Sequence, residues 1–490
     1  MDYKKETKQT LIARCKELGI RGYSGKTKQD LIDLLSKDAN NMSNPEQESI
    51  LPSGTGTFSH LNHISSCSYN LYPELPNVIQ EKEEQTDNQS TNLKFIDLFC
   101  GIGGFHQALN RIGATCVFAC DIDEQCRKTY ERNYGLKPHG DISKLNINAE
   151  TIPEFDILCA GFPCQSFSNS GKKGGLEDKR GKLFEYILQI AALRNPRFLF
   201  LENVKHIMKI DDGKVFEHIL KRIRETGYEV HTIELSPHEF GVPQQRERVV
   251  FICVRRDIYM GNVSAKFVVP NTPIDLSRII ETDTTKTAKY RISKDDEAIL
   301  SAWDEMVHAF DVGESMSPTI LCNEFYTTYT EEEFAKLPEW KRDYKTKNRP
   351  LYEKYKTQWD EWYKRHETLI KRKEIYGKLE WQVGKKKAGD SIFNQFIQFR
   401  QSGIRVKKCE YFPTLVAIVQ TPIYAKERRH ITPRECARLQ SFPDDFVLNE
   451  NDHTAYKQFG NAVNVDVVHF VIYNTLVAYG VLLGHMLNSS

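Results

Sequence analysis

Two residues with reactive side chains directly follow apolar, strand-like segments of the sequence. Cys164 stands in a tight, proline-containing turn after the segment 155–160, and Glu202 comes immediately after the segment 198–201. A thiol at the end of a strand can act as a nucleophile, because the backbone of the turn fixes its direction of approach. The carboxyl ends of consecutive parallel strands meet at one edge of a sheet, where open α/β sheets bind ligands. We therefore expect the thiol and the carboxylate to lie close together at that edge.

This pair of groups suits addition to an electron-poor heterocycle. A thiolate can add to C6 of a cytosine, and a carboxyl group hydrogen-bonded at N3 stabilises the charge that develops there. The enamine formed in this way makes C5 nucleophilic enough to take a methyl group from a sulfonium. Each residue also has an ordinary interpretation: Cys164 as a small buried hydrophobic residue, and Glu202 as a helix N-cap or a surface charge.

A glycine-rich segment precedes these residues. An apolar strand-like run at 93–99 is followed by glycines, an apparent helix at 105–112, and a second strand-like run at 114–120 that ends in Asp121. Glycines let a ligand approach the backbone, and an acid about twenty residues further on can bind ribose hydroxyls. The spacing differs from that of dinucleotide enzymes and equally suits S-adenosylmethionine. Close packing of a helix on a strand would also select glycine. We expect a third strand to end near Gly140.

Composition restricts the class of protein. With 40% hydrophobic and 27% charged residues, the 490-residue chain reads as globular with two or three domains. The formal net charge is +1, so nucleic-acid affinity must come from local patches. The 12 cysteines include no CxxC pair, so we expect neither a metal site nor a disulfide framework. Polar residues interrupt the apolar segment 467–487, which favours a buried terminal helix over a membrane span.

The ordered motifs resemble those of the C5-cytosine DNA methyltransferase family, especially its compact bacterial-type members. The resemblance covers about 93–260 and 428–475 and includes FIDLFCGIGG at 95–104, Asp121, GDI at 140–142, GFPCQSFS at 161–168, RGKLF at 180–184, ENV at 202–204, GVPQQRER at 241–248, TPRECARLQSFP at 432–443 and QFGNAV at 458–463. It implies an α/β fold: a Rossmann-like S-adenosylmethionine-dependent methyltransferase domain with an inserted target-recognition domain.

The resemblance also implies roles for single residues. Cys164 would be the covalent nucleophile, Glu202 would contact N3 and the exocyclic amine, and Arg246 and Arg248 would support the activated state near the base. The S-adenosylmethionine pocket would be lined by Phe99, Gly101, Gly103, Gly104, Asp121, Ile122, Asp141, Ile142, Pro163, Leu183 and Asn461.

A loop at 165–180 would close over DNA. It is rich in glycine and lysine, and its candidate contacts are Ser168, Ser170, Lys172, Lys173 and Arg180. Its ordinary interpretation is a solvated loop. The target atoms of a cytosine are stacked inside the duplex, so the base would have to flip out.

Residues 1–38 are predicted to form a small helical module, followed by a flexible linker at 39–92. Residues 1–37 contain nine Lys or Arg and five Asp or Glu, so their net charge is +4. The segments 18–20, 22–28 and 30–31 resemble the SAP family of DNA-binding modules, in which Lys26 and Lys28 would touch phosphates. A helical hairpin for protein contact is the alternative.

The segment 261–428 corresponds to the part that the family uses to choose its DNA sequence. Its centre, 336–387, contains seventeen Lys or Arg and eight Asp or Glu. Aromatic residues at helical spacing predict one amphipathic helix from about Pro350 to Tyr376, with the aromatics in its core face rather than stacking on bases. Candidate DNA contacts in the strand-like part that follows are Arg400, Ser402, Arg405, Lys407 and Lys408. The pair Thr414–Leu415 resembles the Thr-Leu pair of the family's recognition domains, which implies that Thr414 supports the backbone of the flipped nucleotide. Residues 429–490 would return to the catalytic domain.

These observations predict a DNA (cytosine-5) methyltransferase that uses S-adenosylmethionine. We expect double-stranded DNA as its partner, a cognate restriction endonuclease as a functional partner, a monomer, no metal and no membrane. The chain start lacks an apolar secretory core, so we expect a cytoplasmic, viral-factory or, in a eukaryotic host, nuclear protein. Two alternatives remain: a tRNA methyltransferase of the same superfamily, and a catalytically silent DNA-binding protein.

Overall fold

The structure is a computed structural model that describes residues 10–11, 28–29, 31–32, 91–163, 181–316, 319–416 and 420–482. The chain divides into two compact units, 1–84 and 85–490. In the first unit Leu11, Leu31 and Ile32 are buried, and Lys28 is exposed. Most of the predicted SAP-like module and linker, including Lys26, lies outside the described residues.

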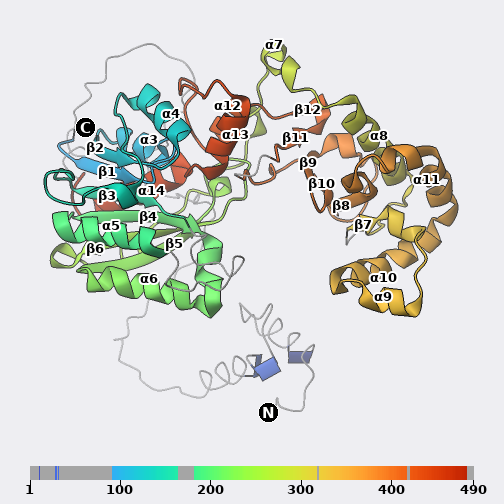
Figure 1. Cartoon of the computed structure of the whole chain (residues 1–490), viewed down its shortest axis with the longest axis horizontal. Coiled ribbons are helices and arrows are strands. Elements are labelled where there is room, and N and C mark those ends of the chain that lie inside the picture. The colour runs from blue at the N-terminus through green and yellow to red at the C-terminus, as the bar shows by residue number, and fades with distance from the viewer. Residues whose placement is uncertain are drawn as a thin grey trace, which may run out of the picture. The chain divides into compact units, whose positions relative to one another are not determined.

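The first sheet of the larger unit has six strands in the order β2-β1-β3-β4-β6-β5 (Figure 1). Pairing is parallel from β2 to β4, whereas β6 runs antiparallel to both β4 and β5. Its strands are β1 (Lys94–Leu98), β2 (Thr115–Cys120), β3 (Ile157–Gly161), β4 (Phe198–Val204), β5 (Tyr228–Leu235) and β6 (Arg248–Arg255). This is the predicted Rossmann-like α/β sheet, with a single reversed strand.

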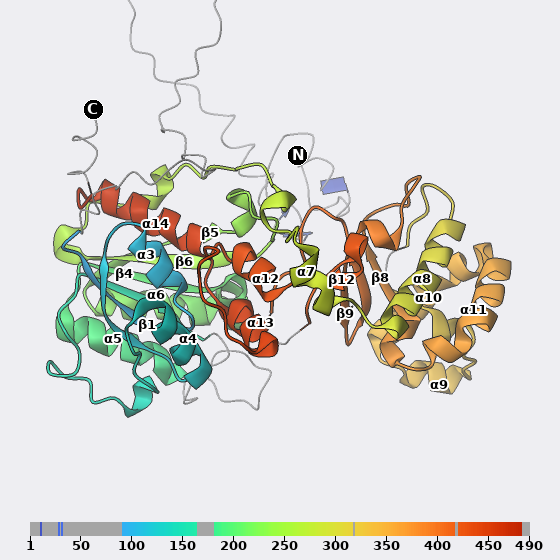
Figure 2. The ribbon, with the colours of Figure 1, turned by 90° about the horizontal axis from the view of Figure 1, so that it is seen from above.

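The central strands are mostly apolar because both faces of this sheet are buried. Phe95 and Ile157 face one hydrophobic core, and their neighbours Ile96 and Leu158 face the other. Helices α3 (Gly104–Asn110) and α14 (Val465–Ala478) contribute to the first core. Helices α5 (Gly181–Arg194) and α6 (Lys214–Glu225) contribute to the second, on the opposite face (Figures 1 and 2).

The expected third strand near Gly140 is wrong. His139 forms only a single-residue bridge to Cys120, and a short 3-10 turn, Ile142–Lys144, follows. Asp141 starts that turn because its side chain accepts a hydrogen bond from the backbone of Ser143 at 2.9 Å. A side-chain cap of this kind offers the backbone an alternative to a strand ladder. Helix α4 (Glu124–Tyr134) precedes this connection.

A second six-stranded sheet follows, in the order β12-β11-β9-β10-β8-β7. Its strands are β7 (Ile320–Leu321), β8 (Lys378–Gln382), β9 (Phe396–Arg400), β10 (Gly403–Lys407), β11 (Ile423–Tyr424) and β12 (Arg429–His430). The helices before and within it are α7 (Thr284–Thr287), α8 (Lys294–Ala309), α9 (Glu331–Lys336), α10 (Glu339–Lys354) and α11 (Lys356–Ile370). One face of the sheet packs on a third hydrophobic core, to which helices α8, α10 and α11 contribute.

The predicted single helix from Pro350 to Tyr376 is wrong in its extent. Pro350 lies inside α10, and the helix ends at Tyr355, whose φ of −115° and ψ of 33° are not helical. The Tyr355 hydroxyl donates to Asp311 at 2.9 Å and lies 2.8 Å from Glu314, so tertiary contacts fix this break.

The predicted core role of the aromatic residues is confirmed. Trp359 is fully buried between Trp303 and Trp362, with ring centroids 6.0 and 5.4 Å away. Tyr352 and Tyr376 are buried in the same core.

The last helices contribute to the first hydrophobic core, where α14 packs on α3 and β6. They are α12 (Pro433–Leu439), α13 (Asp452–Asn461) and α14. Asp466 in α14 pairs with Arg111, the C-cap of α3, at 2.7 Å, and His469 lies 3.1 Å from the Ala108 carbonyl. Within the described part of the chain, no helix is long and apolar enough to span a membrane.

Candidate active site and nucleic-acid interface

A buried acid–base pair lies at the carboxyl edge of β4. The Arg248 Nε atom is 2.8 Å from Glu202 Oε1, and both side chains are largely buried. Val204 is opposite Arg248 in the antiparallel ladder, and Glu202 is opposite Val250, so the pair is a diagonal contact on one face of the sheet. A carboxylate fixed by one nitrogen of an arginine retains its second oxygen for another partner.

The end of β3 lies beside this carboxylate. Gly161 is opposite Glu202 in the parallel ladder, and a Cβ at Gly161 would lie 3.7 Å from Glu202 Oε2. The Asn203 side chain donates to the Phe162 carbonyl at 2.8 Å, which fixes the chain just beyond β3. Exposed Pro163 ends this described stretch. The strands that precede Cys164 and Glu202 are thus neighbours and parallel, as the sequence predicted.

Several predicted site residues lie outside the described residues. They are Cys164 and the loop residues Ser168, Ser170, Lys172, Lys173 and Arg180. The structure therefore leaves their assignments as predictions.

Arg246 lies near the pair but makes different contacts. Its guanidinium donates to the backbone carbonyls of Leu415 at 2.7 Å, Gly460 at 3.0 Å and Ala462 at 3.2 Å. Burial lowers the pKa of Arg246, and the nearby charge of Arg248 acts in the same direction. Arg246 thus joins three chain segments, whereas Arg248 contacts the carboxylate.

The glycine segment forms a strained turn between β1 and α3. Phe99, Gly101 and Gly103 have φ values of 54°, 53° and 87°, in the left-handed region that favours glycine. A Cβ at Gly103 would lie 2.4 Å from Tyr134 Cε2, so a side chain there would collide with the ring. At Gly101 no atom lies within 4 Å of the same position, which leaves open space on one side of the turn.

Asp121 fixes this turn from the neighbouring strand. Its carboxylate accepts from the Gly101 amide at 2.8 Å and from the Asp123 amide at 2.7 Å. Burial raises the pKa of Asp121, and the two amide bonds oppose that rise. Ile122, the next residue, is 74% exposed, an unusual position for a large apolar side chain. Open backbone, a fixed acid and an exposed apolar side chain fit a nucleoside-containing ligand such as S-adenosylmethionine.

The segment just after helix α13 packs against the same turn. A Cβ at Gly104 would lie 2.5 Å from the Val463 carbonyl, and the Val463 side chain also approaches Gly161. Asn461, the last residue of α13, is exposed two positions earlier. This close approach explains why glycine is needed at position 104.

Three other predicted cofactor residues have ordinary structural contacts. The Asp141 carboxylate accepts from the Ser143 amide and hydroxyl, bonds that lower its pKa. Ile142 is buried in the second core, and Leu183 packs against that core.

Thr414 connects the second sheet region to the active-site strands. Its hydroxyl donates to the Gln245 carbonyl at 2.7 Å, and the next amide, of Leu415, donates to Gln244 Oε1 at 3.1 Å. The Gln244 amide group donates in turn to the Leu439 carbonyl at 2.9 Å. Sequence reasoning assigned no role to Gln244, although it lies within the matched motif at 241–248.

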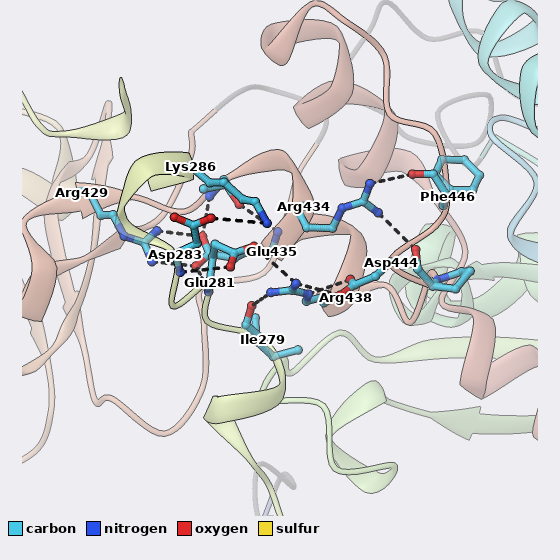
Figure 3. A network of polar contacts seen from close by, with 12 residues as sticks. Ile279, Glu281, Asp283, Lys286, Arg429, Arg434, Glu435, Arg438, Asp444 and Phe446 are labelled. Carbon is cyan, nitrogen blue, oxygen red and sulfur yellow. Dashed lines mark hydrogen bonds and ion pairs between the residues drawn. The ribbon is translucent and has the colours of Figure 1, made fainter. Parts of the chain in front are cut away.

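A network of polar contacts also holds the two chain segments that connect the first sheet to the second (Figure 3). Glu435, which is fully buried at the start of α12, accepts from Arg429 at 2.7 and 2.9 Å and from the Glu281 amide at 2.8 Å. Arg438 of α12 donates to the Ile279 carbonyl at 3.1 Å. The outgoing segment at 279–281 and the returning β12 are therefore attached to one helix.

Arg400, Arg405 and Thr414 line a groove of about 880 Å³ on the outward face of the second sheet. Trp340, whose ring is exposed, and Tyr344 also line the groove, and both belong to α10. Sequence reasoning missed both aromatic residues as groove residues because it placed this helix elsewhere.

The chain is similar in sequence to known proteins of one family. A sequence profile described as "C-5 cytosine-specific DNA methylase" matches residues 93–476. The Type II methyltransferase M.HhaI of Haemophilus parahaemolyticus is 31% identical over 391 residues, 80% of this chain and 96% of that protein. The Type II methyltransferase M.HpaII of Haemophilus parainfluenzae is 32% identical over 393 residues, 79% of this chain and 89% of that protein. The solved structure of S. pombe Dnmt2 methyltransferase covers 79% of this chain and 99% of its own, with 20% identity and a TM-score of 0.45. The chain therefore belongs to the C-5 cytosine-specific DNA methylase family and is a DNA (cytosine-5) methyltransferase.

Proposed function

We propose that this enzyme transfers a methyl group from S-adenosylmethionine to C5 of a cytosine that is flipped out of a specific duplex DNA sequence. The observation that carries the proposal is the Glu202–Arg248 pair beside the end of β3. It supports a site in which a carboxyl group is fixed next to the strand that leads to Cys164.

In this mechanism the Cys164 thiolate forms a bond to C6 of the cytosine. Glu202 hydrogen-bonds N3, where negative charge develops, and Arg248 keeps the carboxyl group in place through its 2.8 Å contact. S-adenosylmethionine, when bound, supplies the electrophilic methyl group. Once C5 carries the methyl group, S-adenosylhomocysteine would remain as the second product. A base such as solvent water then takes the C5 proton, the electrons of that C–H bond form the C5–C6 double bond, and the electrons of the C6–S bond leave with the Cys164 thiolate. The base must leave the stack, because its C5 and C6 atoms are not accessible inside the duplex.

Cofactor residues would surround the turn after β1. Gly101, which has open space beside it, would allow close approach to the backbone, and Asp121 would face the ribose hydroxyls. Phe99, Gly103 and Gly104 are further proposed members of the pocket, and Tyr134 and Val463 pack beside the two glycines. The exposed Ile122 would pack against the adenine face. Asp141, Ile142, Pro163, Leu183 and Asn461 remain proposed members of this pocket.

DNA would lie against positively charged groups from several segments. We assign 93–260 and 429–490 to the catalytic domain and 261–428 to target recognition, with Arg400, Arg405 and Thr414 as contacts. The loop 165–180 and the segment around Lys26 and Lys28 would add phosphate contacts. Because the matched relatives are named Type II methyltransferases, we propose a role in restriction–modification, in which a monomer protects DNA from a partner endonuclease.

Methylation of random-sequence duplex DNA by the full chain tests this function. The expected product is 5-methylcytosine in one short sequence context when S-adenosylmethionine is present, mapped by bisulfite sequencing. Cys164→Ser should abolish transfer while S-adenosylmethionine still binds, whereas Cys409→Ser, a half-buried cysteine of the second region, should remain active. Retained DNA binding with no transfer by the wild type would contradict the proposal, and methylation of RNA alone would move the substrate to tRNA.

A further inference from the structure

The outward face of the second sheet carries polar side chains on three adjacent strands. Alternate residues of β8, β9 and β10 line the groove, while the residues between them, such as Leu379, Ile397 and Ile404, pack in the core. The groove-facing residues are Lys378, Glu380, Gln398, Arg400, Arg405 and Lys407. On these three strands, the face that lines the groove therefore presents hydrogen-bonding groups rather than continuing the third core.

One arginine in this array is fixed by a buried acid. Arg405 and Glu380 are directly opposite each other on the parallel strands β10 and β8. The Arg405 Nε atom donates to Glu380 Oε2 at 2.7 Å, and the Glu380 side chain is only 8% exposed. Within the described residues, the Arg405 side chain forms a hydrogen bond only through Nε. The acid therefore orients the planar guanidinium while its two terminal nitrogens stay available to a ligand.

The charge of the groove favours a polyanion. It is lined by four cationic side chains and one carboxylate, Glu380. Burial lowers the pKa of Lys407, and the charge of neighbouring Arg405 lowers it further. Cations that crowd each other in this way are stabilised by an anionic partner such as a nucleic-acid backbone.

The groove also continues toward the active-site strands. Thr414 lines the groove, and its hydroxyl donates to the Gln245 carbonyl, one residue before Arg246. A duplex bound in the groove would therefore pass close to the segment that joins the second region to the Glu202 edge.

We propose that Arg405 is a specificity-determining residue that reads one guanine of the recognition sequence, and that Glu380 is its positioning residue. The two terminal nitrogens of an arginine match O6 and N7 of guanine in the major groove, which is the commonest specific arginine–base contact. The assignment rests on the proposed function, methylation of duplex DNA, and adds which side chain distinguishes a base.

Replacing each guanine of the recognition sequence in turn by 7-deazaguanine tests the contact without altering the protein. We expect one position at which the substitution lowers kcat/KM of the wild type by about 5- to 150-fold. Arg405→Ala should lower kcat/KM on the normal sequence by a similar factor, and 7-deazaguanine at that position should cause no further loss. The variant should still discriminate at all other positions.

Glu380→Gln separates positioning from general structure. It should weaken discrimination at the same base position as Arg405→Ala, and the double variant should be no worse than Arg405→Ala alone. Arg372→Ala is the matched control, because it breaks an exposed arginine–aspartate pair with Asp295 outside the groove. That variant should keep the wild-type pattern.

Two outcomes would contradict the assignment in different ways. If Arg405→Ala keeps full sensitivity to 7-deazaguanine at every guanine, Arg405 is not the reader, although the enzyme still methylates DNA. If the wild type methylates no duplex DNA at all, the proposed function fails and this assignment fails with it.

Discussion

Arg248 Nε lies 2.8 Å from Glu202 Oε1, and the two residues belong to adjacent strands that run in opposite directions. The end of β4 lies beside the start of β6. The Glu202 carboxylate near the end of β4 therefore contacts the Arg248 guanidinium at the start of β6. Arg246, two residues before Arg248 in the chain, contacts backbone carbonyls instead. Replacing each of the two arginines should therefore affect different kinetic constants.

Arg248→Ala should lower kcat more than it raises KM. Removing a charge-assisted hydrogen bond to the reacting group costs about 1.5–3 kcal/mol, or about 10- to 100-fold in kcat. Steady-state methylation of a defined duplex would measure this effect. If the pair acts as a unit, Arg248→Ala should cause little further loss in a Glu202→Gln background. Fully additive losses would contradict that coupling.

Arg246→Lys should raise KM for both DNA and S-adenosylmethionine. Lysine retains the charge, but it cannot donate at once to the carbonyls of Leu415, Gly460 and Ala462, which lie on both sides of the site. Loss of one such bond predicts an effect of about 10-fold on each KM. A change in kcat alone, with both KM values unaltered, would argue against this connecting role.

Gly103→Ala should destabilise the turn before α3. The residue has a φ of 87°, and the new Cβ would meet the Tyr134 ring at 2.4 Å. The left-handed conformation alone costs about 1–2 kcal/mol for alanine. Urea unfolding and S-adenosylmethionine binding should both report the change. Gly140→Ala is the control, since no atom lies within 4 Å of its Cβ, and it should stay within about 0.5 kcal/mol of the wild type.

His106 should make the folded state less stable as the pH falls. Burial lowers its pKa from 6.5 to about 3, so the folded protein keeps His106 neutral while the unfolded chain takes up a proton. Between these two values the unfolded state binds more protons, and the unfolding free energy falls by about 1.4 kcal/mol per pH unit for this group. Urea unfolding of His106→Gln between about pH 6 and pH 4 should show a flatter pH dependence than the wild type. Parallel profiles would contradict this.

Trp359→Ala should strongly destabilise the second region. Its side chain is fully buried between two other tryptophans, and truncation of such a residue costs about 3–5 kcal/mol. Trp340, which is 54% exposed, is the matched control, and its replacement by alanine should change the unfolding free energy by about 0.5 kcal/mol or less. Unfolding followed by circular dichroism distinguishes the two.

The local features of the fold were predictable, because each has a sequence signal of its own. The buried strand before Glu202 is a continuous apolar run, and the turn after β1 required glycine at 101 and 103. The direction of β6 had no such signal. An apolar strand that is buried on both faces looks the same whichever way it runs.

The structural features that could not be predicted from the sequence depend on tertiary contacts. The helix break at Tyr355 follows from its bonds to Asp311 and Glu314, which lie far away in the sequence. The different contacts of Arg246 and Arg248 could not be predicted from the sequence either. Strand β6 begins only at Arg248, so strand alternation could not be extended back to Arg246. The partnership of Glu380 with Arg405 required the strand register.

The pairing of Arg111 with Asp466 spans 355 positions of the chain. During synthesis, the part of α3 that packs on α14 therefore stays uncovered until α14 leaves the ribosome. Such distant contacts form slowly and leave surface open to aggregation. The helices and strands between 294 and 430 instead make one core from a continuous stretch. We expect this inserted region to fold first. The first sheet, although its strands are synthesised earlier, completes its packing only when α14 is available.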